Sequence, residues 1–168
     1  RNKAIIAVLA STGVRIENLL SVTMDRLIKI EEGYKIEYTK AETKGKVDTT
    51  IYIVGRNAEL LEDYLKVRKD KAGLNLLFGS VNGKKISRSD MLTIINKRVK
   101  YLGIQKHITS HSFRAYTANA LLSNGIEPVI IRKMLGWASD KQDMLSSVYY
   151  RSEAQEKQII EYSQILWK

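Results

Sequence analysis

The spacing of hydrophobic residues predicts helices at the start of the chain and a sheet after them. Residues 3–11 are apolar on nearly every side and a glycine follows at position 13, which predicts a buried helix that stops there. Apolar residues continue at helical spacing in 16–22. Residues 26–54 then show alternating and β-branched runs, interrupted by Glu-Gly and Lys-Gly pairs. This second pattern predicts a small three-stranded antiparallel sheet.

The remaining segments have mainly helical spacing. Residues 58–71 are amphipathic, and a further helix is predicted at 89–101 after a turn-rich stretch. The apolar stripe of that further helix is expected to be Leu92, Ile95, Val99 and Leu102. From there the chain is expected to be helical almost to its end, with one helix starting near Pro128 and stopping at Gly136. These elements predict an α+β fold that is mainly α-helical.

Chain length and the last segment bear on the domain organisation. With 168 residues and 44% hydrophobic content, residues 1–168 are expected to form a single domain. The tail at 152–168 is predicted to be a charged helix that also carries apolar side chains. These are Ile159, Ile160, Tyr162, Ile165, Leu166 and Trp167. Because such a set requires burial, the tail must dock either on its own domain or on a neighbouring subunit.

The charge of the chain indicates a polyanionic partner. There are 28 Lys and Arg residues against 18 Asp and Glu residues, a net charge of +10, which favours nucleic acid or an anionic membrane surface. No segment reaches the run of about 18 apolar residues that a membrane span requires, and the opening residues lack a signal-peptide pattern. We therefore expect a soluble protein without a membrane partner. Its expected location is the cytoplasm, or the interior of the host cell if a virus or mobile element encodes it.

The absence of cysteine restricts the chemistry. Without cysteine there is no disulfide, thiol nucleophile or thiolate metal site, and two histidines, His107 and His111, argue against a histidine metal site. Neither a metal nor a cofactor is expected. Any catalysis is then carried out by oxygen and nitrogen side chains.

Two arginines have the setting of phosphate ligands. Arg15 and Arg114 are each flanked by apolar residues, and a buried guanidinium needs a partner, for which a phosphate fits bidentately. The alternative is a structural arginine tied to Glu17 or to a backbone carbonyl. His111 precedes Arg114 by three residues, a one-turn spacing at which both side chains can face the same phosphate.

The order of several motifs resembles a known family. The segments TGVRIENLLSV, ETKGKVDTTIYI, HSFRAYTANALLSNG, IRKMLGWAS and SSVYYR follow one another in this order. Together they resemble the catalytic domain of the tyrosine recombinases, the phage-integrase family, over residues 1–150. A single motif of this kind is weak evidence, whereas five in the family's order are specific. The resemblance implies the tyrosine recombinase catalytic-domain fold.

The resemblance also implies a role for individual residues. Arg15 and Arg114 would clamp the scissile phosphate, and His111 would hydrogen-bond the same phosphate and assist proton transfer. Lys44 would lie on a β-hairpin that reaches the DNA and would protonate the leaving 5′ oxygen. Trp137 stands where many members have a second histidine, and its indole N–H can donate one hydrogen bond to a phosphate oxygen but cannot shuttle a proton.

Some positions depart from the family's pattern or have a competing interpretation. Asn18 stands where a glutamate is usual, and Glu17 comes one residue early. Lys40 and Lys46 are close enough to Lys44 to be confused with it. Trp137 could also be a loop residue that covers the core. The loop before the nucleophile is longer than usual, by about three residues, which blurs the choice of tyrosine.

Two adjacent tyrosines compete for the role of nucleophile. In a helix from Asp143, Tyr149 lies four residues after buried Leu145, so helical phase makes Tyr150 the more exposed of the two. The family's frame instead places an aliphatic residue before the tyrosine and a basic residue two positions after it, which fits Tyr149. Tyr149 is the preferred nucleophile and Tyr150 the alternative.

The resemblance implies a site-specific DNA recombinase or integrase. Such an enzyme cleaves and rejoins double-stranded DNA through a 3′-phosphotyrosyl intermediate without metal, and the family acts as a tetramer on DNA, so self-association is expected. The alternatives are strand cleavage of the type IB topoisomerase kind and a non-catalytic DNA-binding module. Members usually carry an N-terminal helical domain that clamps the DNA. Residues 1–168 are expected not to include this domain and to form a catalytic fragment.

Overall fold

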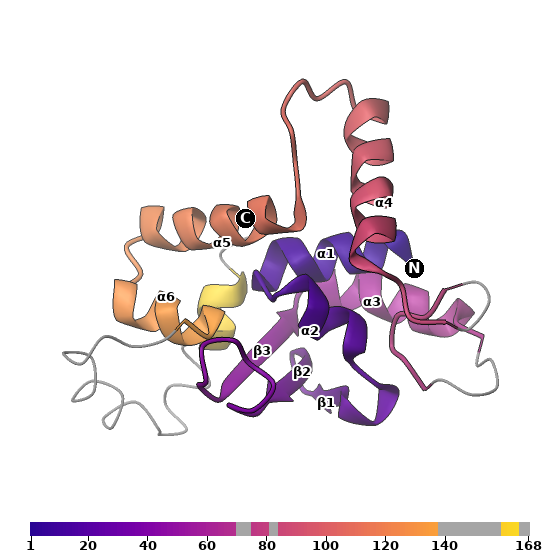
Figure 1. Ribbon diagram of the computed structural model, residues 1–168. Coiled ribbons are helices and arrows are strands. Elements are labelled where there is room, and N and C mark those ends of the chain that lie inside the picture. The colour runs from indigo at the N-terminus through magenta and orange to yellow at the C-terminus, as the bar shows by residue number, and fades with distance from the viewer. Residues whose placement is uncertain (70–74, 81–83, 138–158, 165–168) are drawn as a thin grey trace.

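The computed structural model describes residues 1–69, 75–80, 84–137 and 159–164. Helices surround one antiparallel sheet with the strand order β1-β2-β3 (Figure 1), which confirms the predicted α+β class. In chain order the elements are α1 (Asn2–Thr12), α2 (Ile16–Ser21), η1 (Met24–Arg26), β1 (Ile28–Ile30), β2 (Gly33–Tyr38), β3 (Thr49–Val54), α3 (Arg56–Val67), α4 (Arg88–Tyr101), α5 (Ser110–Ser123) and α6 (Pro128–Leu135). Residues 159–164 are also helical. None of the helices in these ranges is long and apolar enough to cross a membrane.

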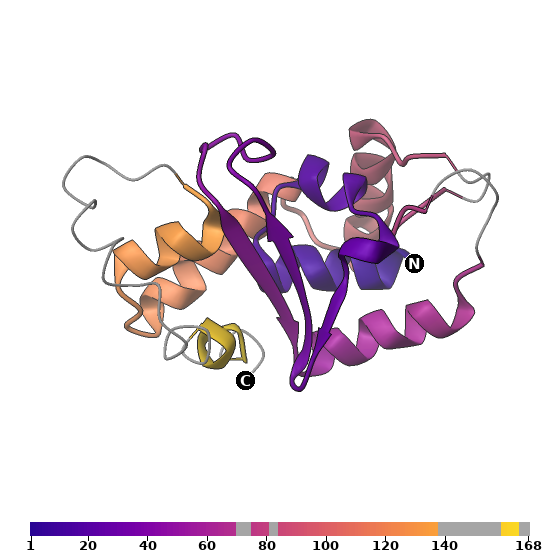
Figure 2. The same cartoon turned by 90° about the horizontal axis from the view of Figure 1, so that it is seen from below.

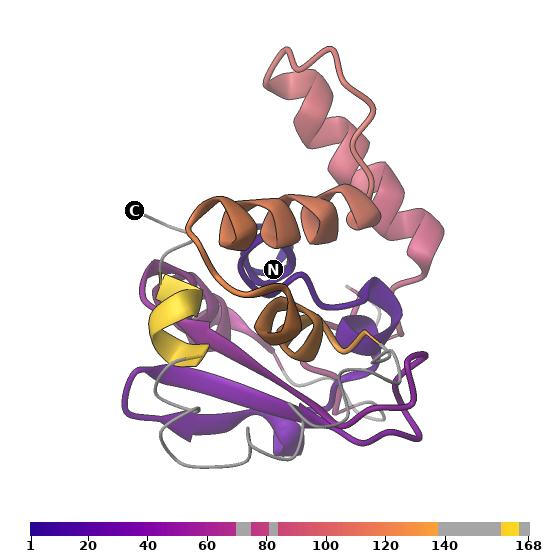
Figure 3. The same ribbon diagram turned by 90° about the vertical axis from the view of Figure 1, so that its left-hand side faces the viewer.

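One face of the sheet packs on the helical core, and the opposite face is covered mainly at β3, so β3 is buried along most of its length. Figure 2 shows the sheet between α6 on one side and α3 on the other. The cross-strand pairs that face the helical core are Tyr34–Ile53, Ile36–Ile51 and Tyr38–Thr49. On the opposite face, Tyr52 and Val54 pack against Ile160 of the helical segment 159–164, drawn in yellow in Figure 3. This described part of the tail therefore docks on its own domain.

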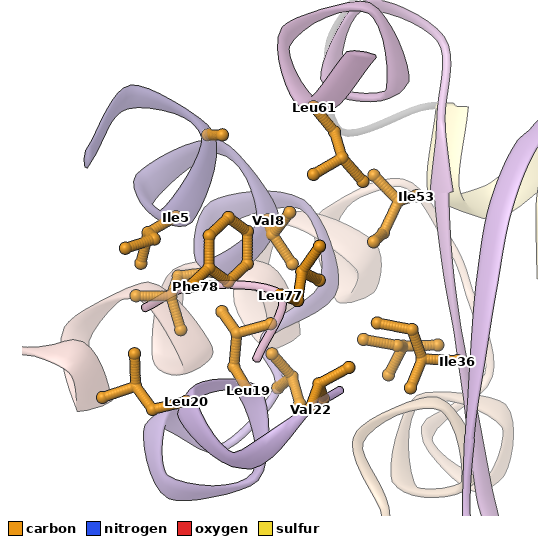
Figure 4. Packing of buried hydrophobic residues seen from close by; sticks show 14 of the residues in the cluster. Ile5, Val8, Leu19, Leu20, Val22, Ile36, Ile53, Leu61, Leu77 and Phe78 are labelled. Atoms are coloured by element: carbon orange, nitrogen blue, oxygen red, sulfur yellow. The ribbon is translucent and has the colours of Figure 1, made fainter. Parts of the chain in front are cut away.

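Helix α1 lies in the middle of the main core. Figure 3 looks along α1, with α5 on one side of it and the sheet on the other, and α3 contacts it as well. Ile5, Val8 and Leu9 of α1 are fully buried. Leu77 and Phe78, which follow α3 in the chain, pack between α1 and α2 (Figure 4). From Ala4 to Thr12 every residue of the helix except Ile6 is buried, as its apolar run predicts.

A second apolar cluster joins α5 to α6. Its buried members are Leu121, Ile126, Ile130, Ile131, Met134 and Leu135. Pro128 is the first residue of α6, and Gly136 ends the helix in the left-handed conformation with φ of 60°, so both predicted boundaries are confirmed. This packing brings the C-terminal end of α6 close to α5.

Helix α4 differs from its prediction in the residues that it buries. The helix projects from the body of the domain (Figure 1). Ile95 is buried as predicted, but its buried partner one turn earlier is Met91, whereas Leu92 and Leu102 are 36% and 66% exposed. The predicted stripe was therefore wrong at Leu92 and Leu102. At the far end of α4, Tyr101 is 81% exposed, whereas Val99 in the same turn packs against the main core.

Two boundaries were also predicted wrongly. Residues 102–109, expected to be helical, form an irregular link that returns from the tip of α4 to α5 (Figure 1). Gly103 starts this link with φ of 66°, a left-handed conformation that stops a helix. Helix α3 ends at Val67 instead of continuing to 71.

Candidate active site

Arg114 is buried and bonded to two backbone carbonyls. It lies on α5 with 5% of its surface exposed. Its Nη1 donates a hydrogen bond to the carbonyl oxygen of Gly13 at 2.7 Å, and its Nη2 donates to the carbonyl oxygen of Leu135. These carbonyls belong to the C-terminal ends of α1 and α6, where the helix dipole and the unpaired carbonyls attract a cation.

Arg15 is also bonded to a backbone carbonyl at the C-terminal end of α6. It directly precedes α2 and is half-buried, and its Nη1 donates a hydrogen bond to the carbonyl oxygen of Gly136 at 3.2 Å. Glu17 instead lies 3.7 Å from Arg88 in an exposed ion pair. The alternative in which Glu17 holds the arginine is therefore wrong, and the alternative of a backbone carbonyl holds for both arginines. Each guanidinium carries several N–H donors, so these bonds leave donors for a ligand.

The two arginines line one small pocket. Its lining residues are Val14, Arg15, Asn18, Tyr38, Thr43, Thr49, Ile51, Arg114, Met134 and Leu135. Burial, followed by the charge of Arg15, lowers the pKa of Arg114 to about 10, so Arg114 still carries its charge at neutral pH. Among the residues that the structure describes, the lining includes two cations and no carboxylate. Such a pocket favours an anion, because an anion would offset the repulsion between the guanidinium groups.

The close packing of Gly136 sets the position of the carbonyl that binds Arg15. A Cβ atom at Gly136 would lie 2.4 Å from Thr49 Oγ1, and the residue has φ of 60°. Strand β3 thus packs directly on the end of α6. Only glycine fits this position without displacing Thr49.

We expect Gly136→Ala to lower the free energy of unfolding by about 3 kcal/mol, since it combines a left-handed backbone with overpacking. Gly125→Ala is the matched control, because Gly125 has φ of 78° and no atom within 4 Å of the added Cβ. In the control, the free energy of unfolding is expected to fall only by the cost of a left-handed backbone at alanine, about 1 kcal/mol. Urea unfolding of both variants measures the difference. Equal losses would show that contact with Thr49 costs nothing.

The loop between β2 and β3 contributes Thr43 to the pocket and carries Lys44 as the next residue in the sequence, although Lys44 itself is not among the lining residues. Thr43 lines the pocket, donating from Oγ1 to the carbonyl oxygen of Val47 at 2.7 Å and accepting from its N–H at 3.0 Å. Glu42 forms an ion pair with Arg26 of η1. Lys44 itself is exposed. These bonds hold the residues on either side of Lys44 in the folded loop.

The ion pair in this loop predicts a pH dependence. Hydrogen bonds from Arg26, followed by that from the backbone of Thr39, lower the pKa of Glu42 from 4.5 to about 2. The folded state therefore gains stability from ionised Glu42 at neutral pH, and loses it as the pH falls from about 4.5 to about 2. The gain is less than about 1 kcal/mol, because both side chains are partly exposed.

We therefore expect wild type to be slightly more stable than Glu42→Gln at pH 7, and this advantage to disappear by about pH 2. Denaturant unfolding of both proteins over this pH range measures it. Glu31→Gln, at an exposed position between β1 and β2, is the control. A stability difference that stays constant with pH would contradict the role of the carboxylate.

Trp137 and His111 lie differently with respect to Arg114. The ring centroid of Trp137 is 5.5 Å from Arg114 Cζ, a cation–π contact that brings this side chain to the site. His111 is in the first turn of α5 and is exposed. It is not among the residues that line the pocket. The structure thus brings Arg15, Arg114 and Trp137 together, whereas Tyr149 and Tyr150 lie outside the described residues.

The sequence did not identify every residue of the pocket. Tyr38, Thr43 and Thr49 were not predicted to belong to it. A signal was available for Tyr38, because it continues the inward-facing alternation of Tyr34 and Ile36 to the end of the strand that leads into the lysine loop. No such signal was available for Thr49, because its contact with Gly136 depends on how β3 packs on α6.

Comparisons with known proteins agree with this geometry. The model of the phage integrase family matches residues 1–156. The chain is 30% identical over 146 residues to tyrosine recombinase XerC of Thermodesulfovibrio yellowstonii, covering 83% of this chain and 47% of the relative. It is 29% identical over 158 residues to tyrosine recombinase XerC of Leptospira interrogans, covering 94% of this chain and 48% of the relative. The chain therefore spans about half the length of these relatives.

Solved structures of the same kind share the fold. XerA recombinase matches with a TM-score of 0.70 and 25% identity, covering 96% of this chain and 57% of the other. XerH site-specific recombinase bound to difH substrate matches with a TM-score of 0.67 and 21% identity, covering 94% of this chain and 44% of the other. Since the family model matches nearly the whole chain, with its pocket arginines included, the chain belongs to the phage integrase family.

Proposed function

We propose that residues 1–168 act as the catalytic domain of a site-specific DNA recombinase or integrase. The enzyme would cleave and rejoin double-stranded DNA through a 3′-phosphotyrosyl intermediate. The observation that carries this proposal is the pocket whose described lining contains two guanidinium groups and no carboxylate, which suits the negative charge of a phosphodiester. The phosphotyrosyl bond conserves the energy of the broken bond, so the reaction needs no nucleotide, and the arginines supply the positive charge without a metal.

Each site residue then has a role in one substitution at phosphorus. The tyrosine oxygen, from Tyr149 by preference or from Tyr150, bonds to phosphorus as the bond to the 5′ oxygen breaks. Arg15 and Arg114 bind the non-bridging oxygens, where charge grows in the transition state. A 5′-hydroxyl from another duplex reverses the step and joins the new strand.

The other polar groups would handle protons and position the phosphate. The leaving 5′ oxygen needs a proton, and Lys44 on the loop beside Thr43 is the proposed donor, with His111 as the alternative. Trp137 would hold Arg114 through its ring and donate from its indole N–H to the phosphate. His111 is exposed, so it would reach the phosphate only from the outer side of the pocket.

The surface supports DNA as the partner. The chain has a net charge of +10, and the projecting α4 exposes basic side chains along its length. These are Arg88, Lys97, Arg98 and Lys100. A projecting basic helix suits contact with the phosphates that border a DNA groove. We propose double-stranded DNA as the substrate, self-association on it, and a location inside the cell.

A nicked suicide substrate tests this proposal. A library of nicked duplexes with a randomised core avoids the need for a known target sequence, and the nick lets the 5′ end diffuse away so that the covalent adduct accumulates. We expect an adduct that survives detergent and heat, with DNA attached to the peptide that contains Tyr149 and Tyr150. A related recombinase on its own site is the positive control. Binding without any adduct, while the control reacts, would identify a DNA-binding module instead.

A further inference from the structure

A buried phenol in the pocket has no hydrogen-bond partner. Tyr38 ends β2 with 4% of its surface exposed. Within the described part of the chain, its hydroxyl oxygen is one of a few buried side-chain polar atoms without a partner, the others being the amide atoms of Asn57. Leaving a buried hydroxyl unpaired is costly, so such groups are rare unless a ligand or water satisfies them.

The position of Tyr38 relates it to the two arginines. Tyr38 lines the same pocket as Arg15 and Arg114. Across the sheet it pairs with Thr49, which packs on Gly136, the residue whose carbonyl accepts from Arg15. Tyr38 is therefore the strand partner of the residue that packs against Gly136, to which Arg15 is bonded. Asn57 is absent from the lining of this pocket.

The chemistry of the phenol makes it a donor. Burial is the main cause that raises the pKa of Tyr38, so its hydroxyl keeps its proton throughout the physiological range. The Cζ atom of Arg26 lies 5.5 Å from the centroid of the Tyr38 ring, which helps to hold the ring in place. A protonated hydroxyl that is fixed and unpaired can donate one hydrogen bond to an anion.

We propose that Tyr38 is a phosphate-binding residue, whose hydroxyl donates a hydrogen bond to a non-bridging oxygen of the phosphate that Arg15 and Arg114 hold. This inference rests on the proposed function only in taking the anion of the pocket to be a DNA phosphate. Tyr38 adds a neutral donor to two charged ones. It therefore stabilises the bound phosphate without adding to the repulsion between the cations.

Tyr38→Phe tests the inference, with inorganic phosphate as the probe. The variant removes only the oxygen, and because that oxygen has no protein partner, the protein without phosphate should be at least as stable as wild type. Thermal unfolding is followed as phosphate is titrated against chloride at constant ionic strength. We expect the apparent affinity for phosphate to fall about tenfold in Tyr38→Phe, the loss of one hydrogen bond to a charged group.

Tyr34→Phe is the matched control on the same face of β2. The hydroxyl of Tyr34 donates to Glu62 Oε1 at 3.2 Å, and Tyr34 does not line the pocket. This control should lose stability without phosphate and keep the full response to phosphate. Tyr38→Phe is thus expected to weaken phosphate binding without lowering stability, and Tyr34→Phe to lower stability without weakening phosphate binding.

The outcomes separate this inference from the proposed function. If Tyr38→Phe responds to phosphate as wild type does, the inference is overturned, even if wild type forms the DNA adduct. If wild type forms no adduct but Tyr38→Phe still weakens phosphate binding, the inference stands and the proposed function fails.

Should the Tyr38→Phe variant unfold, an NMR measurement on wild type labelled with ¹³C at the tyrosine Cζ provides a second test. A phosphate-dependent shift of the Tyr38 signal, assigned by comparison with Tyr34→Phe and the remaining single replacements, would support the inference, and an unmoved signal would overturn it.

Discussion

Arg114→Ala is expected to lower the rate of adduct formation about 1,000-fold, because it removes a preorganised donor from the position where charge grows at phosphorus. The side chain is also structural. Its bonds to Gly13 and Leu135 tie the ends of α1 and α6 together, and their carbonyls would lose these donors in the variant. We therefore also expect the free energy of unfolding to fall by about 2 kcal/mol.

These two effects can be separated by experiment. The rate is measured on the nicked substrate at a temperature at which urea unfolding shows that the variant is folded. Arg114→Lys keeps the charge but lacks the planar fork of N–H donors that reaches the two carbonyls and a phosphate in different directions, so its rate should fall between those of wild type and Arg114→Ala. Arg56→Ala, at an exposed position on α3 outside the pocket, is the control. A folded Arg114→Ala that reacts within tenfold of wild type would rule out the proposed clamp.

Much of the fold could be predicted from local sequence. The buried helix before Gly13, the small sheet and the boundaries of α6 all follow from short patterns. Helix α4 was less predictable, because helical spacing alone suggested Leu92 while the core contacts Met91. Which side of a helix is buried depends on where its neighbours lie. At the far end of α4, Tyr101 is 81% exposed and Leu102, which follows the helix, is 66% exposed, and a local pattern does not predict this exposure.

The site was predictable only in part. The apolar setting of Arg15 and Arg114 correctly indicated that each guanidinium needs a partner. The partners are carbonyls of Gly13, Leu135 and Gly136, which are 101, 21 and 121 residues away from the arginines that bond them. Such contacts depend on the meeting of two helix ends in space, which sequence spacing does not encode.

The exposed position of His111 shows a further limit of spacing. Three residues place His111 and Arg114 on neighbouring positions of the helix surface, but Arg114 is 5% exposed, whereas His111 remains on the outside. The one-turn spacing therefore predicted that both residues lie on the same side of α5, but not how deeply each side chain is buried. The site depends on Arg114 reaching inward to the ends of α1 and α6.

Tyr149→Phe is expected to abolish the covalent adduct, because phenylalanine has no oxygen that can attack phosphorus. A phenol has a pKa of about 10, so the attacking tyrosine must be activated within the site, and the positive charge of Arg15 and Arg114 favours the phenolate. Neither tyrosine lies among the described residues, so the choice between them depends on the family's frame. Tyr150→Phe serves as the matched variant and should keep most of the rate, since it leaves the oxygen of the preferred nucleophile in place. DNA binding by gel shift should be unchanged in both variants.

Two outcomes would contradict the assignment of Tyr149. An adduct that survives Tyr149→Phe and disappears in Tyr150→Phe would identify Tyr150 as the nucleophile, as its exposure from helical phase suggests. An adduct that survives in the double variant would exclude both tyrosines as the nucleophile.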